Sequence, residues 1–266
     1  MNNFKKTLVL FACAVLLVAG SVFGTFAYLT DNDSVTNTFT VGQVHLTLDE
    51  ALVSADGMGK ALDADGDVVA YYDNNGDLNG DLSSAHRWQP SNNDPDQQYH
   101  LLPGHTYVKD PTVTVDANSE DAYVRMMVTI TYKDAADAVF AEYLEDSEDM
   151  FSAWIDIDST NWIVNDAGEK SETEDVTVGD STVTFVSRTY EFRYVGNDNE
   201  SPKKGIVVKN PKETELPALF TKLTVPGAVT NDQIALLADM KIEVVAHAIQ
   251  ADGFADAGEA WEAFTE

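Results

Sequence analysis

The segment from Ala122 to Tyr132 places an apolar residue at every second position. This alternation brings the apolar side chains to one face of an extended strand, and no single face of a helix would collect them. The predicted outer face carries Arg125, Thr129 and Thr131. The predicted inner face consists of Val124, Met126, Val128, Ile130 and Tyr132. Because such a strand needs partner strands and a covering layer, the segment restricts the chain to a β-rich fold.

The same period recurs along the chain, in Phe39–Leu48, Thr182–Tyr194 and Met240–Gln250. Val245 and Ile249 add apolar residues to the second face of the last segment, which predicts a central strand covered on both sides. Shorter strands are expected at Trp162–Val164, at Leu219–Val225 and around Tyr107–Val115. Because Pro111 has no amide donor, the last of these is either an edge strand or begins after the proline. We therefore predict an all-β fold, an antiparallel β-sandwich of the jelly-roll or Greek-key type with short helical insertions.

Two stretches interrupt the strand pattern. Residues 51–93 are rich in Asp, Asn and Gly and predict an acidic insertion or long loop, with room for one hairpin. Residues 134–160 predict a helical insertion, since apolar residues change to helical spacing after Ala135. Further short helices are expected after Thr230, which forms a capping box with Gln233, and at Asp256–Phe264. Residues 28–266 then form a single domain.

The N-terminus has the pattern of an export signal. Lys5 and Lys6 precede an uncharged apolar run, and small residues occupy the minus-three and minus-one positions of a cut after Ala27. This predicts that residues 1–27 are a cleaved signal peptide, with Thr25, Ala27 and Tyr28 at the cleavage site. The alternative is an uncleaved membrane anchor, because roughly 18 to 20 apolar residues can cross a bilayer. We expect a secreted protein that touches the membrane only through an uncleaved signal.

Cysteine content and charge limit the partners. Cys13 is the single cysteine and lies in the predicted signal, so the mature chain would have no disulfide although it is exported. The formal charge is -29, which repels nucleic-acid phosphates and anionic lipids. Divalent cations and basic proteins are better suited as partners. The alternative is that the charge only keeps the protein soluble.

Several sequence blocks together resemble the TasA/camelysin group of secreted bacterial proteins, which has a SipW-type signal peptide. The blocks are 24–31 (GTFAYLTD), 37–42 (NTFTVG), 102–104 with 109–111 (LPG and KDP), 123–125 (YVR) and 246–254 with 260–261 (AHAIQADGF and AW). The resemblance implies a jelly-roll protein, an ER-type signal peptidase as its partner during export, and deposition at the cell surface or in the biofilm matrix. In fibre-forming members the freed N-terminal arm donates a strand to the next subunit.

The camelysin name also implies a zinc protease, which directs attention to the histidines. They are His45, His86, His100, His105 and His247. No His-Glu-x-x-His helix is present, and a Pro-Gly pair separates His100 from His105, so structural or surface roles are expected. Neither a Gly-x-Ser-x-Gly elbow nor a phosphate-binding loop occurs in the sequence.

A candidate calcium site lies in the acidic insertion. Asn75, Asp77, Asn79 and Asp81 alternate as oxygen ligands do in the first half of a calcium loop. The twelfth place of that loop is His86 rather than a bidentate Glu, and the same composition suits any solvated turn. We therefore expect no cofactor, with calcium as the one candidate.

These observations predict a secreted cell-surface or matrix structural protein that acts through protein–protein contacts, either self-association or contacts with other matrix proteins. Fibres could form by strand donation through Phe39, Val41, Val44, Leu46 and Leu48. The alternative for this segment is the first strand of its own domain. Alternative functions are a secreted zinc-dependent endopeptidase of camelysin type and a surface adhesin.

Overall fold

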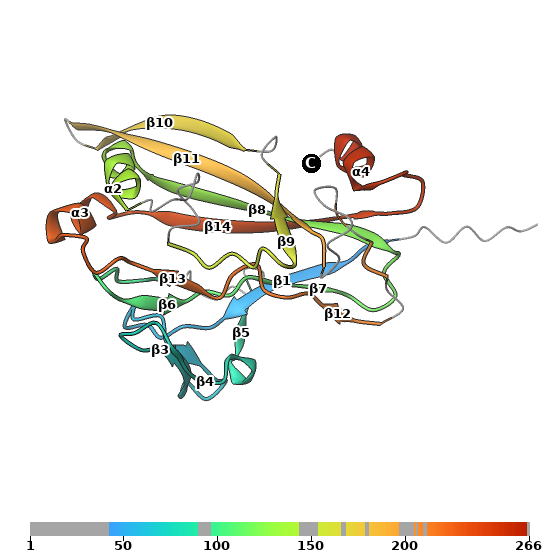
Figure 1. Ribbon diagram of the computed structural model, residues 1–266, viewed down its shortest axis with the longest axis horizontal. Helices are drawn as coiled ribbons and strands as arrows, with labels where there is room; N and C mark the ends of the chain where they lie inside the picture. Colours follow the sequence, from blue (N-terminus) through green and yellow to red (C-terminus); the bar gives the residue numbers. More distant parts are fainter. Residues whose placement is uncertain are drawn as a thin grey trace, which may run out of the picture. The chain divides into compact units, whose positions relative to one another are not determined.

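The computed structural model describes residues 43–89, 97–143, 154–165, 169–178, 181–196, 205, 207–209 and 212–264. Residues from Gly42 to Glu266 form one compact unit (Figure 1). Strands make up most of its regular structure, and every strand pair is antiparallel. The predicted all-β class is thereby confirmed. None of the helices in the described ranges combines the length and the apolar character needed to cross a bilayer.

The largest sheet has the strand order β10-β11-β8-β14, and β9 pairs with the far end of β11. Its long strands follow the predicted alternation, and their cross-strand apolar pairs hold the register. The bounds are β8 Ala122–Lys133, β9 Trp162–Val164, β10 Lys170–Val178, β11 Ser181–Tyr194 and β14 Lys241–Gln250.

Three smaller sheets complete the strand content, with the orders β12-β7-β1-β5, β13-β6 and β2-β3-β4. Strand β7 begins directly after Pro111, as expected for a residue without an amide donor. The bounds are β1 Leu46–Ala51, β2 Ala61–Leu62, β3 Val68–Tyr72, β4 Leu78–Gly80, β5 Arg87–Trp88, β6 Thr106–Val108, β7 Thr112–Val115, β12 Thr214–Glu215 and β13 Lys222–Thr224.

The helices are short and start at good capping residues. Thr230 and Gln233 form the predicted capping box at the start of α3, and Asp256 caps α4 by accepting from the amide of Glu259. The bounds are η1 Leu82–Ser84, η3 Asp134–Ala136, α2 Asp137–Glu142, α3 Asn231–Leu236 and α4 Ala257–Ala263.

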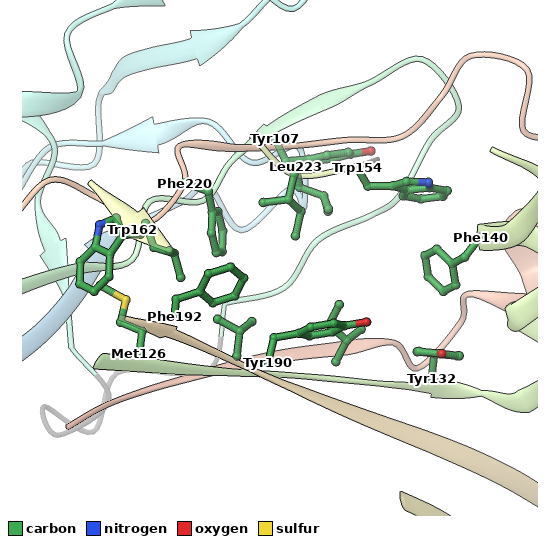
Figure 2. Packing of buried hydrophobic residues seen from close by; sticks show 14 of the residues in the cluster. Tyr107, Met126, Tyr132, Phe140, Trp154, Trp162, Tyr190, Phe192, Phe220 and Leu223 are labelled. Carbon is green, nitrogen blue, oxygen red and sulfur yellow. The ribbon is translucent and has the colours of Figure 1, made fainter. Parts of the chain in front are cut away.

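One hydrophobic core joins the largest sheet to the strands and loops opposite it. Figure 2 shows Met126, Tyr190 and Phe192 of this sheet facing Phe220 and Leu223. The aromatic rings of the core meet edge to face, as aromatic pairs prefer. For example, the ring centroids of Phe140 and Trp154 are 5.1 Å apart and those of Tyr132 and Phe140 are 5.0 Å apart.

Strand β8 confirms the predicted inner face, since its five alternating residues are all at most 5% exposed. On the outer face, Arg125 is only 9% exposed. Helix α4 covers this position and packs Trp261 and Phe264 over the guanidinium group. Arg125 lies on the predicted outer face, but its burial was not predicted, because the pattern of β8 alone contains no information about a helix that arrives from the end of the chain.

Two other predictions are refined or corrected by the structure. We predicted residues 51–93 to be an insertion or long loop with room for one hairpin, and the described part contains the hairpin β3–β4 extended by β2 into a three-stranded sheet, whose core of alanines and valines is small. We predicted a central position for the last strand, but β14 lies at the end of the strand order. Its apolar second face reflects partial cover by α4 near Ile249 rather than a strand on each side.

Candidate functional site: an open edge beside the core

In the part of the chain that the structure describes, β14 is an edge strand, and the backbone groups on the side away from β8 have no ladder partner there. Among the described residues it pairs only with β8, through all ten of its positions. The amide of Ala251 donates to the carbonyl of Asp121, which fixes the alternation of the antiparallel ladder. The N–H and C=O groups that point away from β8 are therefore those of Ile242, Val244, Ala246 and Ala248. Such a row is a template for another strand.

The inner face of β14 is incompletely buried. Ile242, Val244, Ala246 and Ala248 are all half-buried, whereas their direct partners on β8 are at most 5% exposed. Leu46 and Leu48 of β1, which lies beside β14, are half-buried in the same way. We call these six residues the seam. The core is closed at β8 and remains open to solvent along the seam, so an additional apolar strand would complete its burial.

An apolar cleft opens beside the start of β14. Its lining residues come from β8, α2, β13, β14 and the stretch before β9: Ile130, Phe140, Trp154, Ile155, Leu223, Met240 and Ile242. The indole Nε1 of Trp154 is buried there without a hydrogen-bond partner in the described structure. A buried indole donor normally has a partner. The cleft holds only about 10 Å³ of free space, so it has room for a water-sized group and not for an added side chain.

The opposite edge of the large sheet has a different chemistry. Strand β10 carries Glu172, Glu174 and Asp175, all exposed. Charged side chains on an edge strand oppose the docking of another strand. The large sheet therefore presents one edge protected by negative charge and one edge, at β14, that is open and bordered by apolar side chains.

The residues predicted to donate a strand are divided by the fold. Leu46 and Leu48 lie in β1 and pair with Val115 and Val113 of β7 in the same chain. Val44 precedes the strand, in a stretch held by the hydrogen bond from the amide of Glu120 to the carbonyl of Gln43. Phe39 and Val41 lie outside the described residues, as do the predicted cleavage-site residues Thr25, Ala27 and Tyr28.

A second cluster, missed by the sequence patterns, holds β1 to β5 and to the β6–β7 connection. Arg87 pairs with Asp49 at 2.7 Å and with Asp110 at 2.6 Å. Burial raises the pKa of Asp110, although Arg87 and the amide of Ala51 favour its charged form. The sequence contained the Lys-Asp-Pro block but gave no sign of the partners, which are far away along the chain.

Beside this network, Lys109 is 8% exposed and its Nζ lies 2.9 Å from both carboxylate oxygens of Glu50, which is 7% exposed. The same carboxylate accepts a hydrogen bond from the side-chain amide of Gln97. Two buried charges taken out of water need such complete pairing. The two ion-pair groups lie on adjacent residues, Asp49 with Glu50 and Lys109 with Asp110, and together they join β1 and β5 to the β6–β7 connection.

The candidate calcium ligands are placed along β4 and its flanking turns. The backbone amide of Asp77 donates a hydrogen bond to the carboxylate of Asp73, which closes the turn before β4. The carboxylate of Asp81 caps the 3-10 helix η1. The side chain of Asn79 donates to the carbonyl of Asp77, and the amide of Asn75 donates to Asp73. Specific calcium binding stays a prediction.

The five histidines are distributed over separate parts of the fold. His45 bonds with Gln43, and His247 accepts from Nε of Arg125 at 3.2 Å. In the part of the chain that the structure describes, no group of three or more His, Cys, Asp or Glu side chains has the geometry to hold a metal ion.

Comparisons with known proteins returned no match: no protein-family model fits the chain, and no curated protein or solved structure is detectably similar.

Proposed function

We propose that this chain is a secreted cell-surface or biofilm-matrix structural protein that assembles by strand donation. The arm from Tyr28 to Gly42, freed by an ER-type signal peptidase, pairs with the open edge of β14 on a neighbouring subunit. The proposal extends the resemblance of the sequence to the TasA/camelysin group and takes the fold to be a jelly-roll sandwich. Self-association is its main contact, and matrix proteins are further partners.

The observation that carries the proposal is the combination of an open edge with an open core at β14. Backbone groups of Ile242, Val244, Ala246 and Ala248 supply the ladder for an added strand. The seam supplies burial for its side chains. In this mode main-chain bonds give affinity, and alternating apolar side chains fix the register.

The arm is the occupant that the chain itself offers. It ends three residues before β1, and β1 lies beside β14. Its alternating residues Phe39 and Val41 have the spacing that an added strand needs for one buried face. Since Leu46 and Leu48 are already paired with β7, the donated part lies upstream of them.

Mass spectrometry and electron microscopy of the secreted protein test this function. We expect an N-terminus at Tyr28 and fibres that disappear when Tyr28–Thr40 is removed. Ala246→Pro should also abolish fibres, because it deletes an outward amide without breaking a bond to β8. Ala246→Val is the matched control, because it adds similar volume and keeps the amide. A membrane-bound uncut product, or fibres that persist without the arm, would contradict the proposal.

A further inference from the structure

The buried contacts of Glu50 contain more than an ion pair. Its carboxylate binds two different groups at once: Lys109 Nζ at 2.9 Å and the side-chain amide Nε2 of Gln97 at 3.2 Å, both on the same oxygen, Oε2. The carbonyl oxygen of Gln97 accepts a hydrogen bond from the backbone amide of Val53 at 2.7 Å. These two contacts fix the orientation of the Gln97 amide, since a flipped amide would face donor with donor and acceptor with acceptor.

The Glu50 carboxylate, the Lys109 amine, the Gln97 side-chain amide and the Val53 backbone N–H are the groups that an acyl transfer requires. An amine and an amide are held on one proton carrier, and a backbone N–H faces the carbonyl oxygen on which negative charge would develop. Ala51, Val53 and Val108 are buried around the cluster, the Tyr99 ring centroid lies 5.8 Å from Lys109 Nζ, and the charged Arg87–Asp110 pair lies beside it. A buried lysine can give up its proton to a partner carboxylate, whereas an arginine such as Arg87 cannot act as a nucleophile.

We propose that Lys109 and Gln97 form an intramolecular isopeptide bond with Glu50 as the proton carrier. Glu50 takes a proton from the Lys109 ammonium group, and the neutral amine attacks Cδ of Gln97. The Val53 amide stabilises the oxygen of the tetrahedral intermediate. Glu50 then returns the proton to the departing nitrogen. One C–N bond forms, the Cδ–Nε2 bond breaks, and the Lys109 ammonium and the Gln97 amide become a secondary amide and an ammonium ion, with no oxidant required.

The bond would give an exported chain a covalent lock without cysteine. Cys13 is the single cysteine and lies in the predicted signal, so disulfides are not an option for the mature domain. The cluster lies at the end of β1 that is opposite to the donated arm. A lock at this point would fasten the segment that follows residue 96 to the β6–β7 connection. The proposal does not depend on strand donation, and either one can fail alone.

Intact mass of the purified secreted protein under denaturing conditions tests the inference directly. The expected mass is lower than that of the unmodified mature chain by one ammonia, about 17 Da. Trypsin cleaves after free lysine, so the crosslinked protein should lack cleavage at Lys109. It should instead yield a peptide from Trp88 to Arg125 that carries the same mass loss. An unmodified mass with complete cleavage after Lys109 would overturn the proposal.

Variants assign the roles. Lys109→Arg keeps the charge and Gln97→Met keeps the side-chain length, and each should restore the full mass. Glu50→Gln should also restore it, because Gln cannot carry the proton. Gln98→Met changes the exposed neighbour of Gln97 and should retain the loss of ammonia. A mass loss that survives Gln97→Met would place the crosslink elsewhere and contradict the assignment. Because the wild-type protein gives the primary result, a variant that fails to fold leaves the test decisive.

Discussion

Asp110 is the residue at which burial and pairing oppose each other most directly. It accepts hydrogen bonds from the Ala51 amide and from Arg87, yet it is only 5% exposed. Burial costs the charged carboxylate more free energy than these contacts return, so its pKa is raised. Strong hydrogen bonds around a buried carboxylate therefore do not by themselves mean that its charge stabilises the fold.

A pH dependence follows from the raised pKa of Asp110. The folded state holds the Asp110 proton more tightly than the unfolded state. The protonated side chain therefore adds to the unfolding free energy, fully so below the ordinary pKa of Asp, and this addition is lost as pH rises through the pKa of Asp110 in the folded state. We expect the unfolding free energy of the wild type, minus that of Asp110→Asn, to fall as pH rises from about 4 towards neutrality. Urea denaturation across this range measures the difference. A difference that grows with pH would contradict the raised pKa.

At the scale of elements, the hairpin β3–β4 depends on a glycine that permits close backbone approach. Gly80 has a φ of +98°, and a Cβ atom there would overlap the carbonyl oxygen of Val69. Gly66 has a similar φ of +86° with no atom within 4 Å of a built Cβ. Both positions have a left-handed φ, but Gly80 lies in β4 beside the backbone of β3, whereas Gly66 lies in the turn before β3 with open space around it.

Alanine at these positions should separate backbone strain from steric overlap. Gly66→Ala should lower the unfolding free energy by about 1 kcal/mol, from the left-handed conformation alone. Gly80→Ala should cost about 1 to 3 kcal/mol more, because the strands must move apart. Thermal or urea unfolding of both variants measures this. Equal costs would mean that the β3–β4 pairing is looser than described.

Helix α4 is held on the large sheet by its aromatic residues. Trp261 is 6% exposed, and the Arg125 guanidinium carbon lies 4.5 Å from its ring centroid and 4.8 Å from that of Phe264. Trp261→Ala should cost about 3 kcal/mol or undock the helix, since it removes a large buried side chain and uncovers Arg125. Amide exchange in α4 should then accelerate. Glu262→Ala is the control, because Glu262 lies on the exposed side of the same helix, and it should leave amide exchange in α4 unchanged. Equal acceleration of exchange in both variants would contradict this packing.

Strands with strong alternation could be predicted from the sequence, and weak or polar ones could not. Strand β8 follows its apolar period closely. Strand β10 has the sequence KSETEDVTV, which contains little apolar pattern, and it exists because it pairs along β11. The cover over Arg125 and the network at Asp110 depend on contacts between distant segments. Tertiary contacts of this kind leave no local signal in the chain.

For the whole molecule, the sequence suggested an arm but could not identify the edge that receives it. The apolar second face of β14 predicted a central strand, whereas the structure places β14 at the end of the sheet with its inner face half-buried. Our proposal accounts for the half-buried inner face, because a strand from a neighbouring subunit would extend the sheet past β14 and cover the seam. The apolar second face has a separate cause, since Ile249 packs with the residues of α4.

Amide hydrogen exchange resolved at single residues tests this central claim most directly. The protein lacking Tyr28–Gly42 is mixed with a synthetic peptide of that sequence. We predict slower exchange at Ile242, Val244, Ala246 and Ala248, whose amides point away from β8, and no change at Glu243 and Val245, whose amides already bond to it. Unchanged exchange at the four outward amides, or protection along β10 instead, would contradict the account.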